Sequence, residues 1–481
     1  MNSPFNERKY KGLLEGLEVS EVMLSELSKI DDNENFRIDS EFFKKEFIID
    51  ENSVKSIKWN YLGNLSKSII NFGAYSLCNH IQFLDEGVPY LNVGDIKENV
   101  IEWENAKKIN KDLSIGVLHK SLAKNRQVVL TIAGTIGNAA VAYNLPMYTN
   151  SNQAIANITT KDELNPFYLS VYLNSHYGKS QTKKLTISSV QPNLLLTQVK
   201  RIKIPIPSAT FQQTVEEKVK KSHSKREHSQ SLYRQAEELL LETVGLKDVI
   251  LNTKGTNIKS FKDSFLATGR LDAEYYQPKY EKIISKVKKR PHEILGNLVT
   301  IKKSIEPGSD VYVDEGLPFI RVSDYNKFGI STPEKCLSDY FCKENAALLK
   351  SLYPKKETIL FSKDGSVGTA YMLRENMQAV TSGAILHLTV KNKTEILPEY
   401  LTLALNSEVV KRQAERDAGG SIILHWRINE IENVVVPIVD YKTQQQIASL
   451  VEESFSLRRE SERLLEEAKE MVEQEIEKGA I

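Results

Sequence analysis

Two long stretches of the chain place apolar or small residues every three or four positions, which is the spacing of one face of an α-helix. They cover Phe211–Thr243 and Tyr441–Lys478, and neither contains glycine or proline. The stripe of the second comprises Ile447, Leu450, Val451, Ser454, Arg458, Ser461, Leu464, Leu465, Ala468, Met471 and Val472. That of the first comprises Val215, Val219, Ser222, Leu232, Ala236 and Leu239. At a rise of 1.5 Å per residue, each stretch predicts a helical rod on the order of 50 Å.

A narrow apolar stripe flanked by charge requires a partner surface. We expect the two helices to pair antiparallel as a coiled coil. The alternative is that each helix packs only against its own domain. The middle of the first helix, Ser222–Gln230, is polar, and a looser contact is expected there.

The remaining segments consist of short β-type runs separated by Gly, Asn and Pro, with helical patterns between them. Strands are expected at Val88–Val93, Gln127–Ile132, Ala139–Ala142 and Ile202–Ile206. Helices are expected at Pro166–His176 and Pro398–Glu415, each of which opens with proline. This mixture predicts the α+β class.

The sequence matches itself about 230 positions downstream, in one unchanged order. The matched pairs are Phe36–Asp39 and Gly269–Asp272, Leu62–Leu65 and Leu295–Leu298, Asp85–Tyr90 and Asp314–Phe319, Gly134–Gly137 and Gly365–Gly368, Tyr168–Leu169 and Tyr400–Leu401, Leu173–Ser175 and Leu405–Ser407, Ile204–Ile206 and Val436–Ile438, and Gln212–Gln213 and Gln444–Gln445. So many collinear matches indicate a duplication.

The repeat also continues across the chain ends. Leu14–Leu17 resembles Val244–Leu246, which follows the first long helix. We therefore expect circular pseudo-twofold symmetry, with the N-terminal segment completing the C-terminal helical region. The expected organisation is an N-terminal segment (1–35), a first globular domain (36–207), a central helix (208–250), a linker (251–268), a second globular domain (269–439) and a C-terminal helix (440–481).

Composition narrows the class of protein. The 481 residues carry a net charge of +1, which by itself favours no partner. No apolar run is long enough for a membrane span and the first residues are polar, so a cytoplasmic protein is expected. The three cysteines, Cys78, Cys336 and Cys342, are too few and too scattered for a disulfide framework or a four-ligand zinc site.

Catalytic motifs are missing from the sequence. Asn165–Tyr168 is similar to the Asn-Pro-Pro-Tyr loop with which amino-methyltransferases hold a flipped adenine. Its repeat counterpart, Leu397–Tyr400, keeps only the Pro and the Tyr, as a helix start would. No Gly-rich turn for S-adenosylmethionine and no Gly-Lys-Ser/Thr phosphate loop occur. We expect no enzyme activity, cofactor or metal site on this chain.

The full pattern resembles the specificity subunits of type I restriction–modification enzymes. The most specific pieces are Gln191–Leu194 leading into Ile204–Pro207 and Gln212–Gln213, together with the two Gly turns and the long helices. The second copy departs from the pattern at Ile423–Trp426. The resemblance implies two target-recognition domains that read a bipartite, asymmetric DNA sequence. It also implies two methyltransferase subunits and restriction–translocase subunits as partners, which would carry S-adenosylmethionine, ATP and Mg²⁺.

Candidate DNA-binding residues follow from side-chain chemistry. Amides suit adenine edges, guanidinium groups suit guanine, and ammonium groups suit phosphates. The candidates are Lys183, Lys184, Ser189, Gln191 and Asn193 in the first domain, and Arg321, Lys363, Ser421, His425 and Arg427 in the second. Each also has a plainer interpretation: a turn that caps backbone groups, a solvated surface charge, or, for His425, a packed core residue.

Three rival functions remain open from the sequence. A recognition subunit of a two-chain type II enzyme shares this architecture, and the neighbouring genes would discriminate it. An enzyme that uses the helices only as dimerisation arms would show methyl-transfer or nuclease activity by itself. A structural coiled-coil scaffold would be discriminated by testing whether the domains bind duplex DNA with a salt-dependent affinity.

Overall fold

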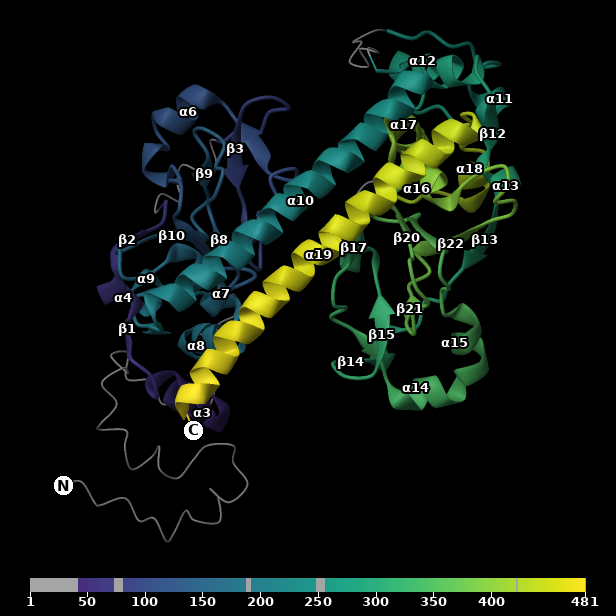
Figure 1. Cartoon of the computed structure of the whole chain (residues 1–481). Coiled ribbons are helices and arrows are strands. Elements are labelled where there is room, and N and C mark those ends of the chain that lie inside the picture. The colour runs from purple at the N-terminus through teal and green to yellow at the C-terminus, as the bar shows by residue number, and fades with distance from the viewer. Residues whose placement is uncertain (1–41, 73–80, 187–191, 248–255, 421–422, 481) are drawn as a thin grey trace, which may run out of the picture. The chain divides into compact units, whose positions relative to one another are not determined.

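The computed structural model describes residues 42–72, 81–186, 192–247, 256–420 and 423–480. The chain divides into two compact units, unit 1 (residues 1–226 and 459–481) and unit 2 (residues 227–458). Two long helices, α10 (Ala209–Thr243) and α19 (Tyr441–Ala480), each contribute residues to both units (Figure 1). No helix in the described ranges is long and apolar enough to cross a membrane.

Unit 1 is built on a four-stranded antiparallel sheet in the order β2-β10-β7-β8. These strands are β2 (Ser66–Ile70), β7 (Val128–Thr131), β8 (Ala139–Val141) and β10 (Ile155–Thr160). A three-stranded sheet, β6-β3-β9, contains a parallel pair, β3 with β9. The other elements are α3 (Lys45–Lys55), β1 (Trp59–Tyr61), α4 (Leu62–Leu65), β3 (Val88–Leu91), η2 (Val93–Asp95), β4 (Ile96–Lys97), β5 (Val100–Ile101), β6 (Lys107–Ile109), α6 (Lys111–Ile115), η3 (His119–Ser121), β9 (Asn150–Ser151), α7 (Pro166–Asn174), α8 (His176–Leu185), α9 (Leu196–Val199) and β11 (Lys203–Pro205).

Unit 2 repeats this topology. Its central sheet has the order β13-β22-β19-β20, and β15 pairs parallel with β21. Its elements are α11 (Phe265–Thr268), α12 (Pro278–Lys288), β12 (His292–Ile294), α13 (Leu295–Leu298), β13 (Val299–Lys303), η4 (Ser309–Val311), β14 (Tyr312–Val313), β15 (Leu317–Ile320), η5 (Val322–Asp324), β16 (Tyr325–Asn326), β17 (Gly329–Ile330), β18 (Cys336–Leu337), α14 (Asp339–Glu344), α15 (Ala346–Leu352), β19 (Ile359–Ser362), β20 (Ala370–Met372), β21 (Val380–Thr381), β22 (Ile385–Val390), α16 (Pro398–Asn406), α17 (Glu408–Asp417), α18 (Ile428–Glu432) and β23 (Val435–Pro437). Both units mix helices with largely antiparallel strands, as predicted.

The buried hydrogen bonds repeat as well. In unit 1, Asn174 Nδ2 donates to the Ala139 carbonyl at 2.7 Å, and Asn174 Oδ1 accepts from the Ala139 amide at 3.1 Å. In unit 2, Asn406 makes the same two bonds to Ala370, at 2.8 and 3.0 Å. Each asparagine therefore pairs with the backbone of a sheet-edge residue as another strand would.

Two further side chains bind backbone groups identically in the two units. The Tyr168 hydroxyl donates to the Pro205 carbonyl at 2.9 Å, and that of Tyr400 donates to the Pro437 carbonyl at 2.7 Å. The equivalent glutamines, Gln181 and Gln413, each make two hydrogen bonds to the backbone of one residue. The side-chain amide donates to the carbonyl and accepts from the amide of Lys203 in unit 1 and of Val435 in unit 2. The duplication seen in the sequence is thus kept in the polar contacts of both cores.

One predicted helix is divided in the structure. The single helix expected over Pro398–Glu415 consists of α16 and α17, separated at Ser407, whose backbone is extended. The Ser407 hydroxyl donates to the Ala404 carbonyl at 2.6 Å, and Ser175 does the same to Tyr172 at 2.6 Å in unit 1. Serine competes in this way for helical carbonyls, and the repeated Asn-Ser pair was the available sign of a break.

Within unit 1, α10 and α19 run antiparallel: as the residue numbers increase along α10, those of the contacting residues on α19 decrease. Lys218 pairs with Glu467 at 2.6 Å and Lys225 with Glu460 at 2.8 Å. Between these ion pairs the buried Ser222 hydroxyl donates to the Ser461 carbonyl at 2.9 Å.

Within unit 2 a second serine pair occupies the corresponding place. The hydroxyl of Ser454 donates to the Ser229 carbonyl at 2.8 Å, and both serines are buried. The expectation of a looser contact over Ser222–Gln230 is therefore wrong: small hydroxyl side chains let the two backbones approach closely and satisfy one another. Serine is polar in sequence, but here it is a packing residue.

A buried polar pair differs between the units. His387 on β22 bonds to the Thr381 hydroxyl at 2.8 Å, whereas Asn157 at the matching place on β10 donates to the Ser151 hydroxyl at 2.8 Å. Burial, with a smaller contribution from the charge of Lys302, lowers the pKa of His387 from 6.5 to about 4. The imidazole is therefore neutral in the folded unit near pH 7.

Enlarging a serine at the helix contact should destabilise the protein. Ser461→Leu inserts a branched side chain where no space exists, which should cost roughly 1–3 kcal/mol. Chemical denaturation monitored by far-UV circular dichroism measures the loss. Ser456→Leu, on the exposed side of α19, is the control and should leave the midpoint unchanged. Equal stability of both variants would contradict close packing at this contact.

Protonation of His387 should make unit 2 sensitive to acid. The folded pKa lies below that of the unfolded chain, so the unfolded state binds more protons between about pH 6.5 and 4. Stability should therefore fall as the pH drops through that window. The variant His387→Asn, which copies the residue of unit 1, should lack this component. Denaturation midpoints of both proteins at pH 7.5, 5.5 and 4.5 test the difference.

Candidate nucleic-acid interface

Several loops meet at one end of the central sheet of unit 1. The Ile132 amide donates to the Ala154 carbonyl at 2.8 Å, and the Leu194 amide donates to the Ile132 carbonyl at 2.8 Å. The Asn152 amide donates to the Leu91 carbonyl at 3.0 Å. We call this region the loop end of unit 1; it comprises residues 71, 92–95, 132–137, 152–154 and 192–195.

The polar side chains at this loop end are mostly uncharged amides. Asn71 Nδ2 donates to the Gln153 carbonyl at 3.1 Å, and Asn152 Nδ2 lies 3.4 Å from Asn92 Oδ1. Asn193 sits opposite Ala133 in an isolated β-bridge and is half-buried. Its side-chain amide makes no hydrogen bond to any described residue. The predicted reading residue Asn193 is therefore positioned by its backbone while its amide stays available.

The loop end of unit 2 has the same backbone frame. The Lys363 amide donates to the Ala384 carbonyl at 2.9 Å, the Trp426 amide to the Lys363 carbonyl at 2.7 Å, and the Ser382 amide to the Ile320 carbonyl at 2.8 Å. These bonds match those of Ile132, Leu194 and Asn152 one for one. The region comprises residues 304, 321–324, 363–368, 382–384 and 423–427.

The loop end of unit 2 carries more charged side chains, since Lys363 and Asp364 stand in place of Ile132 and Ala133. Asp364 lies between two of the predicted residues: its Oδ1 is 2.8 Å from Nδ1 of His425, and its Oδ2 accepts from the Lys363 ammonium. The side chain of His425 is 64% exposed, which excludes the core interpretation of this histidine. Lys363 is mostly buried and its charge is balanced locally.

Arg321, at the place of Asn92, has two carboxylate partners. Its guanidinium lies 3.5 Å from Asp324 and 3.1 Å from Glu334. Burial opposes the charged form, but these two carboxylates outweigh it and raise the pKa of Arg321 above its ordinary value. The side chain remains one-third exposed. It can reach a ligand only by exchanging or sharing these partners.

Glycines form the turns that carry both loop ends. Gly134 and Gly365 have φ values of 73° and 72°, in the left-handed region that favours glycine. The chain can therefore reverse directly after β7 and β19, which brings the turns against the segments that contain Asn193 and His425.

The two predicted lysines of α8 differ in their surroundings. Lys184 is 12% exposed and binds Glu51 at 2.6 Å, whereas Lys183 is exposed. Burial alone would raise the pKa of Glu51, but the charges of Lys184 and Lys203 lower it to about 2. Lys184 thus holds α8 to α3, whereas Lys183 is the exposed lysine of the two.

The remaining candidates are placed only in part. Arg427 is exposed and lies at the N-terminus of α18, where its backbone amide donates to Glu430 at 3.1 Å. Ser189, Gln191 and Ser421 lie outside the described residues. Sequence reasoning missed Asp364, Asn92 and Asn152; aligning the repeat around Asn193 and His425 was the signal that would have found them.

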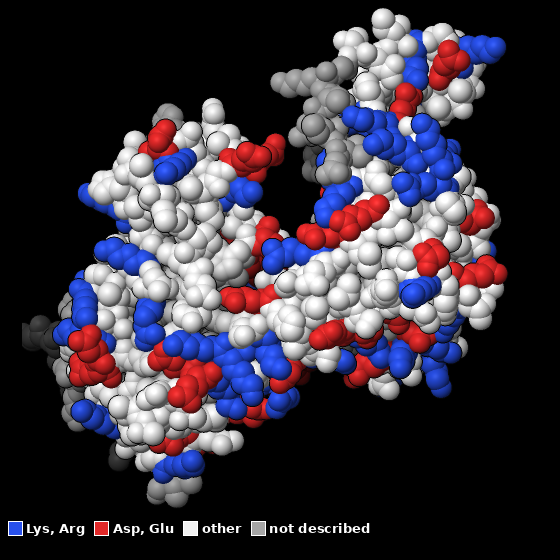
Figure 2. Space-filling model, turned by 45° about the horizontal axis from the view of Figure 1, so that its top comes forward, with Lys and Arg blue, Asp and Glu red and all other residues white. Residues whose placement is uncertain are grey.

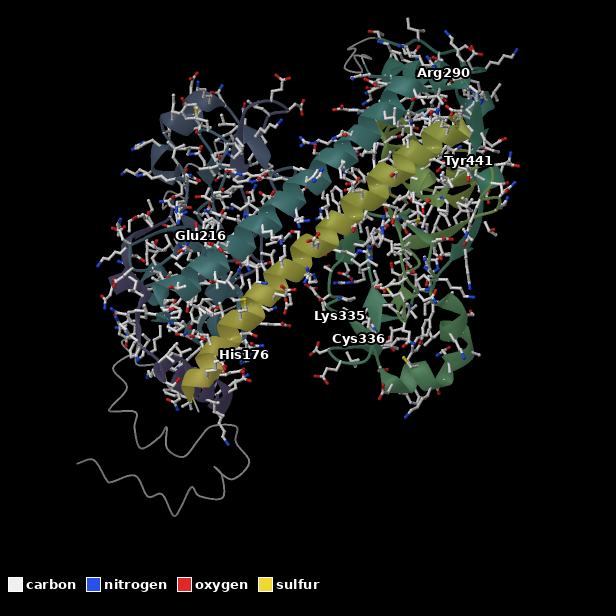
Figure 3. All side chains as sticks on the ribbon, in the orientation of Figure 1. His176, Glu216, Arg290, Lys335, Cys336 and Tyr441 are labelled. Carbon is white, nitrogen blue, oxygen red and sulfur yellow. The ribbon has the colours of Figure 1, made fainter. Side chains whose placement is uncertain are left out.

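The methyltransferase-like motif has a structural role. Asn165 caps α7 by accepting from the Phe167 amide at 2.9 Å, and its Nδ2 donates to Glu216 at 2.5 Å. Glu216 lies on α10 (Figure 3). Burial opposes ionisation of Glu216, but hydrogen bonds from Arg126, Lys220 and Asn165 lower its pKa to about 2. The Asn-Pro-Phe-Tyr sequence is therefore a helix start attached to the long helix.

Surface charge and the arrangement of possible metal ligands indicate whether the chain carries further sites. On the face shown in Figure 2, most of the surface is uncharged, and Lys and Arg gather in two places with Asp and Glu beside them. Among the residues that the structure describes, no group of His, Cys, Asp or Glu is arranged to hold a metal ion. Cys336 and Cys342 are free thiols, and Cys78 lies outside the described residues.

Taken together, a duplicated α+β frame presents equivalent loops with different side chains, as in a two-part recognition protein. The family model described as type I restriction modification DNA specificity domain matches residues 67–224 and 293–468. The chain belongs to this family of specificity subunits, which recognise DNA for restriction–modification enzymes and are not themselves catalytic. Specificity subunits of this kind act together with modification and restriction subunits.

Individual relatives are distant. The specificity subunit of the type I restriction enzyme MjaIX from Methanocaldococcus jannaschii is 24% identical over 375 residues, which cover 76% of this chain and 77% of that protein. The specificity subunit of EcoBI from Escherichia coli is 21% identical over 190 residues, covering 39% of this chain and 38% of that protein.

Solved structures that are similar include the type I S subunit from M. genitalium. It has 14% identity and a TM-score of 0.38, and the match covers 88% of this chain and 96% of that one. The HsdS subunit from Thermoanaerobacter tengcongensis has 14% identity and a TM-score of 0.26, over 87% of this chain and 96% of that one.

The two neighbouring lysines should respond differently to substitution. Lys184→Ala leaves Glu51 with weaker compensation in a buried site and should lower the free energy of unfolding by about 1–3 kcal/mol. Lys183→Ala removes an exposed charge and should change stability by less than about 0.5 kcal/mol. Urea denaturation of both variants makes the comparison. Equal losses would contradict the assignment of Lys184 to the core of unit 1.

Proposed function

We propose that this chain recognises a bipartite, asymmetric DNA sequence, with unit 1 reading one half of the target and unit 2 the other. The observation that carries the proposal is the pair of loop ends. Their backbone hydrogen bonds match, but Asn92, Ala133 and Asn193 in unit 1 correspond to Arg321, Asp364 and His425 in unit 2. One frame with two sets of side chains supports recognition of two different base sequences.

The proposed contacts divide by chemistry. Amides at the loop end of unit 1 suit base edges, and the exposed Lys183 suits a phosphate. At the loop end of unit 2, Arg321 and Arg427 suit guanine or phosphate, and His425 suits a base edge. Ser189, Gln191 and Ser421, at the matching loops in the sequence, stay candidates for the same role. Lys363 and Lys184 are proposed to act indirectly, by positioning their neighbours.

The long helices are proposed to set the distance between the two halves of the target. We infer an antiparallel coiled coil with pseudo-twofold symmetry, supported by the serine pair that each unit forms between α10 and α19. Helices fixed in register by Ser222–Ser461 and Ser229–Ser454 resist sliding, so the number of unread base pairs should be constant. Two methyltransferase subunits and the restriction subunits are the proposed partners, and the catalytic chemistry would belong to them.

Deleting this gene should abolish one methylated sequence from the genome of its host. Genome-wide mapping of methylated adenines, with and without the gene, should show the loss of a single motif made of two unlike halves and a constant gap. Identical methylomes in the cells with and without the gene would contradict the proposal, as would the loss of a motif that has no gap. Complementation with the wild-type gene is the control.

A further inference from the structure

The side chains around Asp364 form a chain of three groups with defined hydrogen-bond roles. Lys363 can only donate, and its ammonium binds Asp364 Oδ2. His425 Nδ1 lies 2.8 Å from Asp364 Oδ1. A carboxylate can only accept, so Nδ1 carries the hydrogen. In the neutral form of such a ring, Nε2 is the hydrogen-bond acceptor.

The backbone of His425 is fixed on both sides. Its amide donates to the Gly419 carbonyl at 2.7 Å, and its carbonyl accepts from the Gly419 amide at 3.1 Å. The next residue, Trp426, is fully buried against Phe361, with ring centroids 5.8 Å apart. No described residue bonds to Nε2 of His425. The ring is therefore held at one nitrogen and exposed at the other.

We propose that His425 is a specificity-determining residue of unit 2, and that its Nε2 accepts a hydrogen bond from the exocyclic amino group of a base in the major groove. Adenine N6 and cytosine N4 are the two amino groups available there. Asp364 is the positioning residue that selects the tautomer. This inference rests on the proposed function and adds to it the chemical identity of one contact.

The equivalent position in unit 1 supports the assignment. Asn193 lies at the same bridge, but its partner there is Ala133, which cannot orient a side chain. An amide needs no tautomer selection, because it carries both a donor and an acceptor. A histidine at this place does need it, and Asp364 occurs only in the copy that has the histidine.

Replacing Asp364 with Asn should reverse the role of Nε2. Lys363 still requires an acceptor and takes the carbonyl oxygen of the new amide, so the NH₂ group faces His425 Nδ1. Nδ1 then becomes the acceptor and Nε2 carries the hydrogen. A donor at Nε2 selects the keto oxygen of guanine or thymine in place of an amino group.

The experiment maps methylated motifs in cells that express the full chain together with its own partner subunits. With Asp364→Asn, one base pair in one half of the motif should change from adenine to guanine, or from cytosine to thymine. Which of the two occurs identifies the contacted base. Methylation of the original sequence should fall about 10-fold. The other half of the motif should stay the same.

Two further variants keep the result interpretable. His425→Asn should relax the preference at that same base pair, which decides the matter if Asp364→Asn proves inactive or unfolded. His292→Asn replaces an exposed histidine of unit 2 on β12 and should leave the motif as it is. Asn193→Ala should alter the opposite half and thereby assign the halves to the units.

The possible failures are distinguishable. If the wild-type chain yields no methylated motif, the proposed function itself fails. If a motif exists but both Asp364→Asn and His425→Asn leave every base pair as before, the inference about His425 is overturned while the proposed function stands. A uniform loss of methylation by His425→Asn, with no change of preference, likewise assigns His425 a structural role and overturns the inference.

Discussion

The structure depends on a small set of side chains that bond to backbone where sheet and helix meet. Asn174 and Asn406 each bind both polar groups of one edge residue, and Gln181 and Gln413 do the same for a strand end. Such buried amides are costly to leave unsatisfied, so they tolerate few alternative arrangements. Because the bonds recur in both units, the loops that they support occupy equivalent places, and comparison of the two loop ends becomes meaningful.

Periodic features could be predicted from the sequence. The stripe on Tyr441–Lys478 identified the buried face of α19, and Ile447, Ser461, Ala468 and Val472 are all buried. The internal repeat gave two domains of one topology. These predictions succeed because periodicity and duplication are properties of many residues at once, so that single exceptions do not alter them.

Individual side-chain contacts could not be predicted from the sequence. The division at Ser407 depends on one hydroxyl choosing a carbonyl within its own turn, and the burial of Lys184 depends on Glu51, far away along the chain. Asp364 could not be predicted as part of the site, because nothing in the sequence distinguishes it from the other carboxylates until the structure places it beside His425. The prediction of a loose contact at the serines of α10 was wrong because a polar side chain need not be exposed. Between two closely packed helices, the small size of serine decides its place more than its polarity does.

The contrast between the loop ends has a consequence for behaviour in different ionic surroundings. Attraction between full charges weakens as dissolved ions shorten the screening length, whereas hydrogen bonds of neutral amides depend chiefly on distance and angle. Under the proposed function, base contacts from the amides at the loop end of unit 1 would therefore depend little on salt concentration, whereas contacts from Arg321 and Arg427 would weaken as the salt concentration rises. Base selection in one half of the target would then vary less with ionic strength than in the other.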